Sequence, residues 1–305
     1  MNEQVCIALI QLAWAGTQPA MMTQYQKMIT EAAAQGAEII CLPEFSLAPY
    51  FPGTQDKAGF AWAEQIPDGA SARFFSQMAS DHRVFVIGSL YEWAANGGLY
   101  DTATIHAPTG ELVAATRKVH IPSGDGYHET DFFAGSDQFP IAALEPIRVA
   151  TPTCYDQWFP ELARIYSLGG AELIVYPTAI GSEPNEPTLD TQAAWETVMR
   201  GHAIANGVFV AAVNRVGVEN GVAFYGSSFV CSPSGQILAK AGRNTPELIL
   251  ATLNASQLTQ WRHFFPLLHQ RRPEVYGQIL QRWEGDKRPL WVEDTPTWRT
   301  KPHDQ

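Results

Sequence analysis

The sequence predicts an α/β protein in which two sheets carry helices on their outer sides. Apolar segments of strand length alternate along the chain with stretches whose apolar residues recur at helical spacing. The order strand, helix, strand, helix, strand, hairpin occurs in each half, which indicates a pseudo-twofold internal repeat. No linker separates the halves, so residues 1–277 are expected to form one domain, followed by a tail at 278–305 that could pack on a neighbouring subunit.

Each element of the first half follows from local patterning. Short apolar runs and helical periodicity predict five elements, namely strands at 5–12, 38–42 and 84–89 and helices at 25–33 and 72–79. The strands are apolar on both faces, as strands are when helices or a second sheet cover them. A hairpin is expected next, with arms at 101–107 and 111–117 joined by a turn that contains Gly110.

The second half repeats this order. The same criteria predict strands at 147–151, 173–176 and 208–213, a helix from Pro160 to Gly169 and a helix at 192–206. Gly207 is a stop signal for the second of these helices. A second hairpin is expected to turn at residues 232–235, and the pattern weakens from about residue 260.

The composition excludes several classes of protein. An apolar fraction of 46% with 17% charged residues is typical of a globular protein. The net charge of −11 argues against a nucleic-acid partner, because phosphate binding needs clustered Lys and Arg. No apolar stretch approaches the roughly 20 residues that span a bilayer, so no membrane partner is expected. The N-terminus lacks a basic segment typical of a signal peptide, and we predict a cytoplasmic protein.

The spacing of potential metal ligands is uninformative. The eight histidines show no H-x-H or H-E-x-x-H pattern, and the four cysteines show no C-x-x-C pattern. Neither a metal ion nor another cofactor is therefore predicted.

Cys154 stands where a predicted strand gives way to the helix that begins at Pro160. A thiol on such a turn lies at the edge of a sheet, near backbone N–H groups that can stabilise an anion. Glu44 follows another predicted strand, and Lys118 follows the first hairpin. Residues after strands can share one crevice. A carboxylate base, an ammonium group and a thiol together indicate nucleophilic attack on a carbonyl or nitrile carbon.

Each of these residues also has a simpler interpretation. Cys154 could be a small buried hydrophobe, Glu44 could cap a loop, and Lys118 could be a solvated hairpin residue. The sequences around them favour the catalytic interpretation.

Three segments resemble the motifs of the nitrilase superfamily of carbon–nitrogen hydrolases, namely residues 42–45 (LPEF), 117–122 (RKVHIP) and 154–161 (CYDQWFPE). The resemblance extends from Gln4 to Tyr276 and implies a four-layer α-β-β-α sandwich of two mixed sheets. It also implies roles for four residues: Glu44 as base, Lys118 as electrostatic stabiliser, Cys154 as nucleophile, and Glu129 as the residue that positions Lys118 and the substrate. The oxyanion hole would combine Lys118 with the backbone N–H of Tyr155.

Within the superfamily, residues 120–129, 156–161, 179–184 and 271–277 resemble the branch of N-carbamoylputrescine amidases. This likeness implies a thiol amidohydrolase that converts an N-carbamoyl amine to the amine, CO₂ and ammonia. The residues assigned to substrate binding are Tyr50, Asp125, Tyr155 and Glu183. Glu183 could pair with the ammonium group of a cationic small-molecule substrate. Ser123, Asp125 and Pro152 depart from the pattern of the branch, which leaves the identity of the amine open.

Several alternatives remain at this level. The same Glu–Lys–Cys triad could act on a carbamoyl amino acid, an ω-amide or a nitrile. The chain could also be a non-catalytic binding protein on this fold, or a Cys–His acyl transferase that uses His120. The family resemblance and the aromatic tail predict a homo-oligomer, a dimer or larger.

Overall fold

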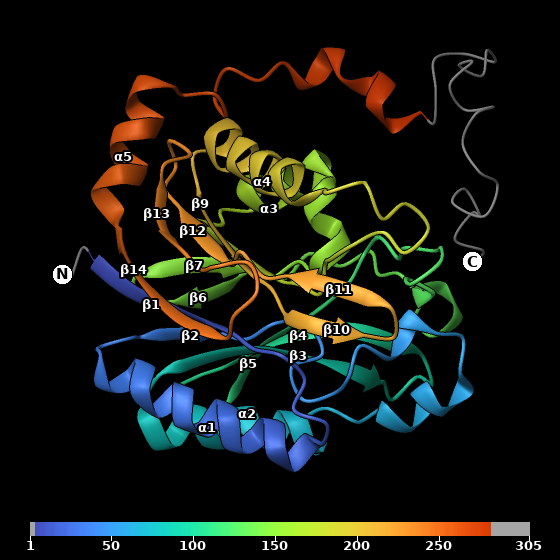
Figure 1. The fold of residues 1–305 in the computed structure, drawn as a ribbon. Coiled ribbons are helices and arrows are strands. Elements are labelled where there is room, and N and C mark those ends of the chain that lie inside the picture. The colour runs from blue at the N-terminus through green and yellow to red at the C-terminus, as the bar shows by residue number, and fades with distance from the viewer. Residues whose placement is uncertain (1–3, 282–305) are drawn as a thin grey trace.

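The computed structural model describes residues 4–281 and contains two six-stranded mixed sheets that lie face to face (Figure 1). The first sheet has the strand order β14-β1-β2-β3-β4-β5. Its strands are β1 (Gln4–Gln11), β2 (Ile39–Cys41), β3 (Phe85–Trp93), β4 (Leu99–His106), β5 (Leu112–Arg117) and β14 (Glu247–Asn254). β1, β2 and β3 are parallel, whereas β4, β5 and β14 pair antiparallel with their neighbours.

The second sheet repeats this topology with the order β13-β12-β9-β8-β7-β6. Its strands are β6 (Ala142–Leu144), β7 (Ile147–Ala150), β8 (Leu173–Pro177), β9 (Phe209–Val213), β12 (Phe229–Cys231) and β13 (Ile237–Lys240). β7, β8 and β9 are parallel, and β6, β12 and β13 are antiparallel to their neighbours. Each sheet thus has one antiparallel edge strand, three parallel strands and a hairpin, which is the internal repeat that the sequence predicted.

Helices cover the outer face of each sheet (Figure 1). α1 (Gln18–Ala34) and α2 (Ala70–His82) pack on the first sheet, and α3 (Pro160–Leu168) and α4 (Gln192–Asn206) pack on the second. A third apolar core fills the space between the sheets, where Leu9 and Ile87 of one sheet meet Val175 and Ala211 of the other. The predicted four-layer α-β-β-α sandwich is therefore confirmed.

Local signals place the helix ends as expected. Pro160 is the first residue of α3, where its missing N–H costs no hydrogen bond. Gly207 ends α4 in a left-handed conformation with φ of 61°, which glycine adopts without strain.

The structure also contains elements that the sequence did not predict. They are β6, the hairpin of β10 (Val216–Glu219) and β11 (Val222–Tyr225), the edge strand β14, and α5 (Ala255–Phe264). β14 pairs with β1, which lies at the other end of the chain, so no local pattern reports this pairing. The strand expected at 147–151 ends at Ala150, and Pro152 therefore lies beyond the hydrogen-bonded ladder that it would interrupt.

Most of the predicted tail lies outside the described residues. Residues 277–280 form a short 3₁₀ turn (Gly277–Leu280), and the proposed packing of 282–305 on another subunit stays a prediction. Within residues 4–281, no helix is long and apolar enough to cross a membrane.

Candidate active site

The ammonium group of Lys118 lies among three buried carboxylates. Its Nζ is 2.5 Å from Glu129 Oε2, 2.8 Å from Glu44 Oε1 and 3.3 Å from Asp101 Oδ2. All four side chains are fully buried, which excludes a solvated hairpin position for Lys118. A lysine in such a place requires close counter-charges, because desolvation of an unpaired ammonium costs several kcal/mol.

Burial and mutual charge shift the pKa values of this cluster. Burial alone would lower the pKa of Lys118, but Glu129, Glu44 and Asp101 outweigh it and raise that pKa well above its usual value. Burial, assisted by Asp101 and Glu129, raises the pKa of Glu44 well above its usual value although Lys118 opposes this. Burial likewise raises the pKa of Glu129. Lys118 therefore stays charged at neutral pH, while Glu44 is well placed to take up a proton.

Glu44 follows β2 in a loop that is hydrogen-bonded to β3. Ser46 Oγ donates to Pro43 O at 2.7 Å and accepts from Ser89 N–H at 3.1 Å, and Phe45 N–H donates to Ser89 Oγ at 3.1 Å. Phe45 has φ of 47°, a left-handed conformation that is uncommon for an aromatic residue. This sharp turn directly follows Glu44, and the hydrogen bonds to Ser89 hold it in place.

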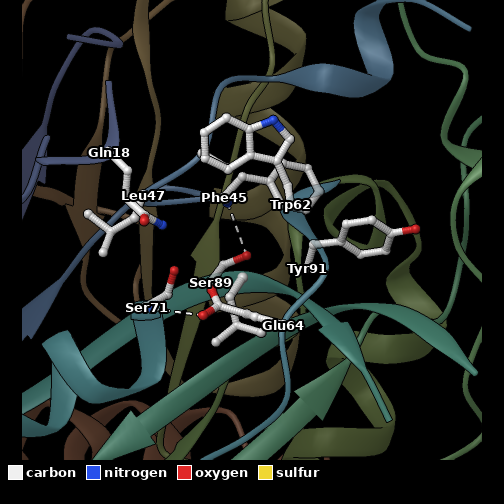
Figure 2. A pocket seen from close by; sticks show the side chains of 10 residues that line it. Gln18, Phe45, Leu47, Trp62, Glu64, Ser71, Ser89 and Tyr91 are labelled. Atoms are coloured by element: carbon white, nitrogen blue, oxygen red, sulfur yellow. Dashed lines mark hydrogen bonds between the residues drawn. The ribbon is translucent and has the colours of Figure 1, made fainter. Parts of the chain in front are cut away.

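A small cavity of about 10 Å³ lies beside this loop. Figure 2 shows Ser89 pointing to the backbone of Phe45, and Glu64 accepting the N–H of Ser71, at 2.8 Å. Burial raises the pKa of Glu64. The cavity can hold about one water molecule at most, so it is too small for a substrate.

Cys154 opens the 3₁₀ helix η4 (Cys154–Trp158) that joins β7 to α3. Its φ of 39° is left-handed, a strain of roughly 1–2 kcal/mol for a residue with a Cβ. The side chain is only 6% exposed. Burial, followed by the charges of Glu44 and Glu129, raises the pKa of the thiol well above its usual value, whereas Lys118 and the N–H of Ala179 act to lower it. The resting thiol is therefore protonated at neutral pH and needs a base to become a nucleophile.

Glu129 begins the short 3₁₀ helix η3 (Glu129–Asp131) and is held by Tyr50. Tyr50 Oη donates to Glu129 Oε1 at 2.9 Å. The tip of the β10–β11 hairpin fixes Tyr50 in turn, because Glu219 Oε2 accepts the N–H of Tyr50 at 2.8 Å and Asn220 Nδ2 donates to its carbonyl at 3.0 Å. The structure thus places Tyr50, which we expected at the substrate, directly against Glu129.

Asp156 joins the cysteine loop to the segment after Lys118. Its carboxylate accepts His120 N–H at 2.8 Å and Val119 N–H at 3.1 Å, and its Oδ1 lies 2.9 Å from His120 Nδ1. The ring of His120 stacks on Phe159 with centroids 3.5 Å apart. This pairing directs His120 to Asp156 and gives no support to a Cys–His pair. The sequence had suggested no role for Asp156, since its partners are more than 30 residues away.

Replacing Asp156 with alanine is expected to remove the hydrogen bonds that join residues 119–120 to the loop of Cys154. Two backbone N–H groups would lose their acceptor, so the free energy of unfolding should fall by about 2–4 kcal/mol. The catalytic rate should also fall, because the segment that carries Lys118 would no longer be fixed to the cysteine loop. Urea unfolding and a rate assay measure the two effects. Asp156→Asn retains one acceptor oxygen, so its losses of stability and of catalytic rate should be smaller. Equal losses in both variants would contradict this role of the Asp156 carboxylate.

The loops that carry Asp125 and Glu183 lie against each other. Asn185 Nδ2 donates to the carboxylate of Asp125. A Cβ on Gly126 would lie 2.6 Å from Pro184 Cγ, which shows how closely the loops approach. Two further hydrogen bonds join them: Tyr127 Oη donates to Ser182 O at 3.1 Å and accepts from Gly181 N–H at 3.3 Å.

Glu183 and Cys154 both act electrostatically on two tyrosines of this region, Tyr127 and Tyr225. Burial is the main cause of the raised pKa values of Tyr127 and Tyr225, and both Glu183 and Cys154 raise them further. Asp125 is exposed and engaged by Asn185. The side chain of Tyr155 is also partly exposed and packs edge-on against Phe159. Of the residues assigned to the substrate, Tyr50 interacts electrostatically with Cys154 itself, and the charge of Glu183 acts on two tyrosines that Cys154 also affects.

Glu44, Asp101 and Glu129 could ligate a cation by geometry alone. The ammonium group of Lys118 lies within 3.3 Å of an oxygen of each carboxylate. In the described part of the chain, this lysine therefore supplies the positive charge of the cluster.

Comparison with known proteins agrees with this geometry. The family model of carbon–nitrogen hydrolases matches residues 6–263. The chain belongs to the carbon–nitrogen hydrolases of the nitrilase superfamily. This carbon–nitrogen hydrolase is 35% identical to a citrullinase of Francisella tularensis over 91% of this chain and 98% of the relative. It is 33% identical to an N-carbamoylputrescine amidase of Solanum lycopersicum, over 92% and 96% of the two chains.

A carbon–nitrogen hydrolase of Helicobacter pylori G27 has a similar solved structure. The TM-score is 0.87 with 32% sequence identity, and the match covers 92% of this chain and all of the other. The family assignment makes this protein a hydrolase of carbon–nitrogen bonds other than peptide bonds.

Proposed function

We propose that this protein hydrolyses an N-carbamoyl amine with Cys154 as nucleophile, Glu44 as base and Lys118 as electrostatic stabiliser. The observation that carries the proposal is the placement of one buried ammonium group between Glu44 and Glu129, with a buried, protonated thiol in electrostatic reach of all three. A thiol that is protonated at rest needs a nearby base, and Glu44 has a raised pKa that suits proton uptake.

The reaction would proceed in two halves. Glu44 accepts the proton of Cys154 while the sulfur attacks the carbamoyl carbon, and Lys118 with the N–H of Tyr155 stabilises the oxyanion. The C–N bond to the terminal amino group breaks, and this group leaves as ammonia with the proton held by Glu44. Water, activated by Glu44, then cleaves the C–S bond. The released carbamate decomposes to CO₂ and the amine.

The substrate class rests on the relatives and on Glu183. N-carbamoylputrescine and citrulline both end in a carbamoyl-amino group, and each is named in a relative of this chain. The charge of Glu183 acts on Tyr127 and Tyr225, as the charge of Cys154 also does, and we propose that the Glu183 carboxylate pairs with a distal ammonium group of the substrate. We therefore propose a cationic carbamoyl amine, with a carbamoyl amino acid as the second candidate.

An ammonia-release panel tests this proposal. Purified protein is offered N-carbamoylputrescine, citrulline, a simple ω-amide and an aliphatic nitrile, and kcat/KM is compared. We expect the highest value for N-carbamoylputrescine. A higher value for citrulline would select the second candidate, whereas turnover of only the ω-amide or the nitrile would refute both. Ligand-induced thermal stabilisation without turnover would indicate a binding protein.

Replacing Glu183 with glutamine should weaken binding of the cationic substrate selectively. Loss of one charge-assisted contact of about 1.4 kcal/mol raises KM about tenfold. KM for an uncharged carbamoyl amine of equal length should change little, and this substrate is the matched control. An equal rise in KM for both substrates would show that Glu183 supports the structure of its loop and does not pair with the substrate ammonium group.

We also propose that the protein forms a homodimer or a larger assembly through the segment that follows α5. This segment passes over the side of the molecule that carries α3 and α4 (Figure 1) and exposes large apolar side chains, with Ile279 67% and Leu280 87% exposed. Exposed apolar groups of this kind are typical of an interface. Light scattering of the full chain should give a molar mass of more than one copy. The double change Ile279→Asp and Leu280→Asp should shift this molar mass toward that of the monomer. A monomeric wild type would refute this assembly.

The proposed location is the cytoplasm. Cys154 must remain a reduced thiol to act as nucleophile, and all four cysteines of the chain are free in the structure.

A further inference from the structure

Asp101 of β4 is a buried acid that the proposed reaction does not use. Its Oδ2 lies 3.3 Å from Lys118 Nζ, and one oxygen each of Glu44, Asp101 and Glu129 lie within 4.8 Å of one another. Three ionised carboxylates and one ammonium group would leave two uncompensated negative charges among fully buried side chains. Carboxyl groups this close together cannot all be ionised at low cost in free energy. One bound proton would halve the excess negative charge of the cluster.

Two oxygens in this cluster accept no hydrogen bond from the described residues, although Lys118 Nζ forms an ion pair with one of them at 3.3 Å. They are Glu44 Oε2 and Asp101 Oδ2, and both side chains are fully buried. The other oxygen of each is occupied, since Glu44 Oε1 accepts from Lys118 at 2.8 Å and Asp101 Oδ1 accepts from Ser89 Oγ at 3.2 Å. Buried polar atoms are rarely left unpaired, and an O–H between two carboxyl groups would satisfy both oxygens together.

We propose that the resting site holds one proton between Glu44 Oε2 and Asp101 Oδ2, and that Asp101 is a positioning residue that sets the protonation state and direction of Glu44. The role of Asp101 in catalysis rests on the proposed function, but the shared proton does not. A hydrogen bond between Glu44 and Asp101 is among the causes that raise the pKa of Glu44, after burial and the charges around it.

The groups that face this proton come from several elements. Lys118 follows β5, Glu129 lies in η3, and Ser89 belongs to β3. Cys154 and Tyr50 also interact electrostatically with Glu44. Of these groups only Lys118 is a cation, so it is the one that opposes protonation of the pair.

The shared proton has a consequence for the first half of the reaction. When it resides on Asp101, Glu44 is a carboxylate and can accept the proton of the Cys154 thiol. The O–H of Asp101 then donates to Glu44 Oε2 and keeps that carboxylate from turning away from Lys118. The thiol proton later leaves with ammonia and the shared proton stays, so no proton is gained or lost at Asp101 over one turnover.

Infrared spectroscopy of the substrate-free protein near neutral pH tests the shared proton. Surface carboxyl groups are ionised there, so a buried carboxylic acid appears as a separate carbonyl stretch. We expect this band in the wild type and its loss in Asp101→Asn, because the amide supplies a donor to Glu44 in place of the O–H. Glu44→Gln should lose the same band, since it removes the other carboxyl group of the pair. This variant provides the test if Asp101→Asn does not fold.

Two control variants locate the band. Ser89→Ala removes a donor to Asp101 and the acceptor of the Phe45 N–H, but it keeps the three carboxylates, so the band should remain. Glu64→Gln removes another buried acid with a raised pKa and should also leave it in place. A wild type without the band, or a band that persists in Asp101→Asn or Glu44→Gln, overturns the proposal. The spectra need no substrate, so a failed ammonia panel with the expected spectra would refute the proposed function and leave the shared proton standing.

Discussion

Lys118→Met is expected to lower the free energy of unfolding by about 3–5 kcal/mol at neutral pH and to abolish hydrolysis. The change removes the only cation from a fully buried cluster of Glu44, Asp101 and Glu129. Their mutual repulsion would then be uncompensated, and no charge would remain to stabilise the thiolate or the oxyanion.

The pH dependence of this loss follows from the direction of the shifts. The wild-type pKa of Glu44 is already raised, and loss of Lys118 would raise it further. A carboxyl whose pKa is raised in the folded state supports folding below its unfolded pKa of about 4.3, and that support is lost as the pH rises. The gap in stability between wild type and Lys118→Met should therefore narrow as the pH is lowered toward about 4.3. Urea unfolding at several pH values measures it.

The neighbouring cation Arg117 offers a matched control. It pairs with Glu92 at 2.7 Å, but its side chain is 29% exposed. Glu92 is buried but keeps the hydroxyl of Thr102 as a donor at 2.7 Å, so removal of Arg117 should cost less than removal of Lys118, about 1–3 kcal/mol. Comparable losses in Arg117→Met and Lys118→Met, or a Lys118→Met variant as stable as the wild type, would show that the buried charges are balanced in another way.

Cys154→Ala is expected to abolish ammonia release while the protein stays folded. Loss of the nucleophile in a hydrolase can lower kcat by on the order of a million-fold. Cys41→Ala is the control, because Cys41 is also buried but lies in the core between the two sheets. Turnover by Cys154→Ala equal to that of the wild type would refute the proposed mechanism.

Stability measurements on the same residue test the strain at Cys154. Its φ of 39° is costly for any residue with a Cβ but not for glycine. Relief of this strain should favour Cys154→Gly over Cys154→Ala by about 1–2 kcal/mol. The larger chain entropy that glycine loses on folding offsets about 0.5–1 kcal/mol of this gain. We therefore expect the glycine variant to be more stable by about 1 kcal/mol. A lower melting temperature for the glycine variant would mean that the turn is unstrained.

Much of the fold was predictable because its signals are local. The three apolar strands and two helices of each half were marked by periodicity, and Pro160 and Gly207 marked helix ends. The same holds for the candidate residues Glu44, Lys118 and Cys154, since each stands in a short motif after a strand or hairpin. The missed elements β6, β10, β11 and β14 are short or depend on partners that are distant in the sequence.

The sequence by itself therefore determined the family, the four-layer sandwich and the three residues of the proposed triad. Only the tertiary structure decided which groups surround them. Asp101 meets Lys118, Asp156 holds the segment after Lys118, and Glu219 holds Tyr50 across 169 residues of chain. The physical reason is that periodicity and motifs report on neighbours along the chain. The pairing of buried carboxylates with an ammonium group depends on how the two sheets and their loops pack. This packing surrounds Cys154 with Glu44 and Glu129, two acidic groups that its own motif does not indicate.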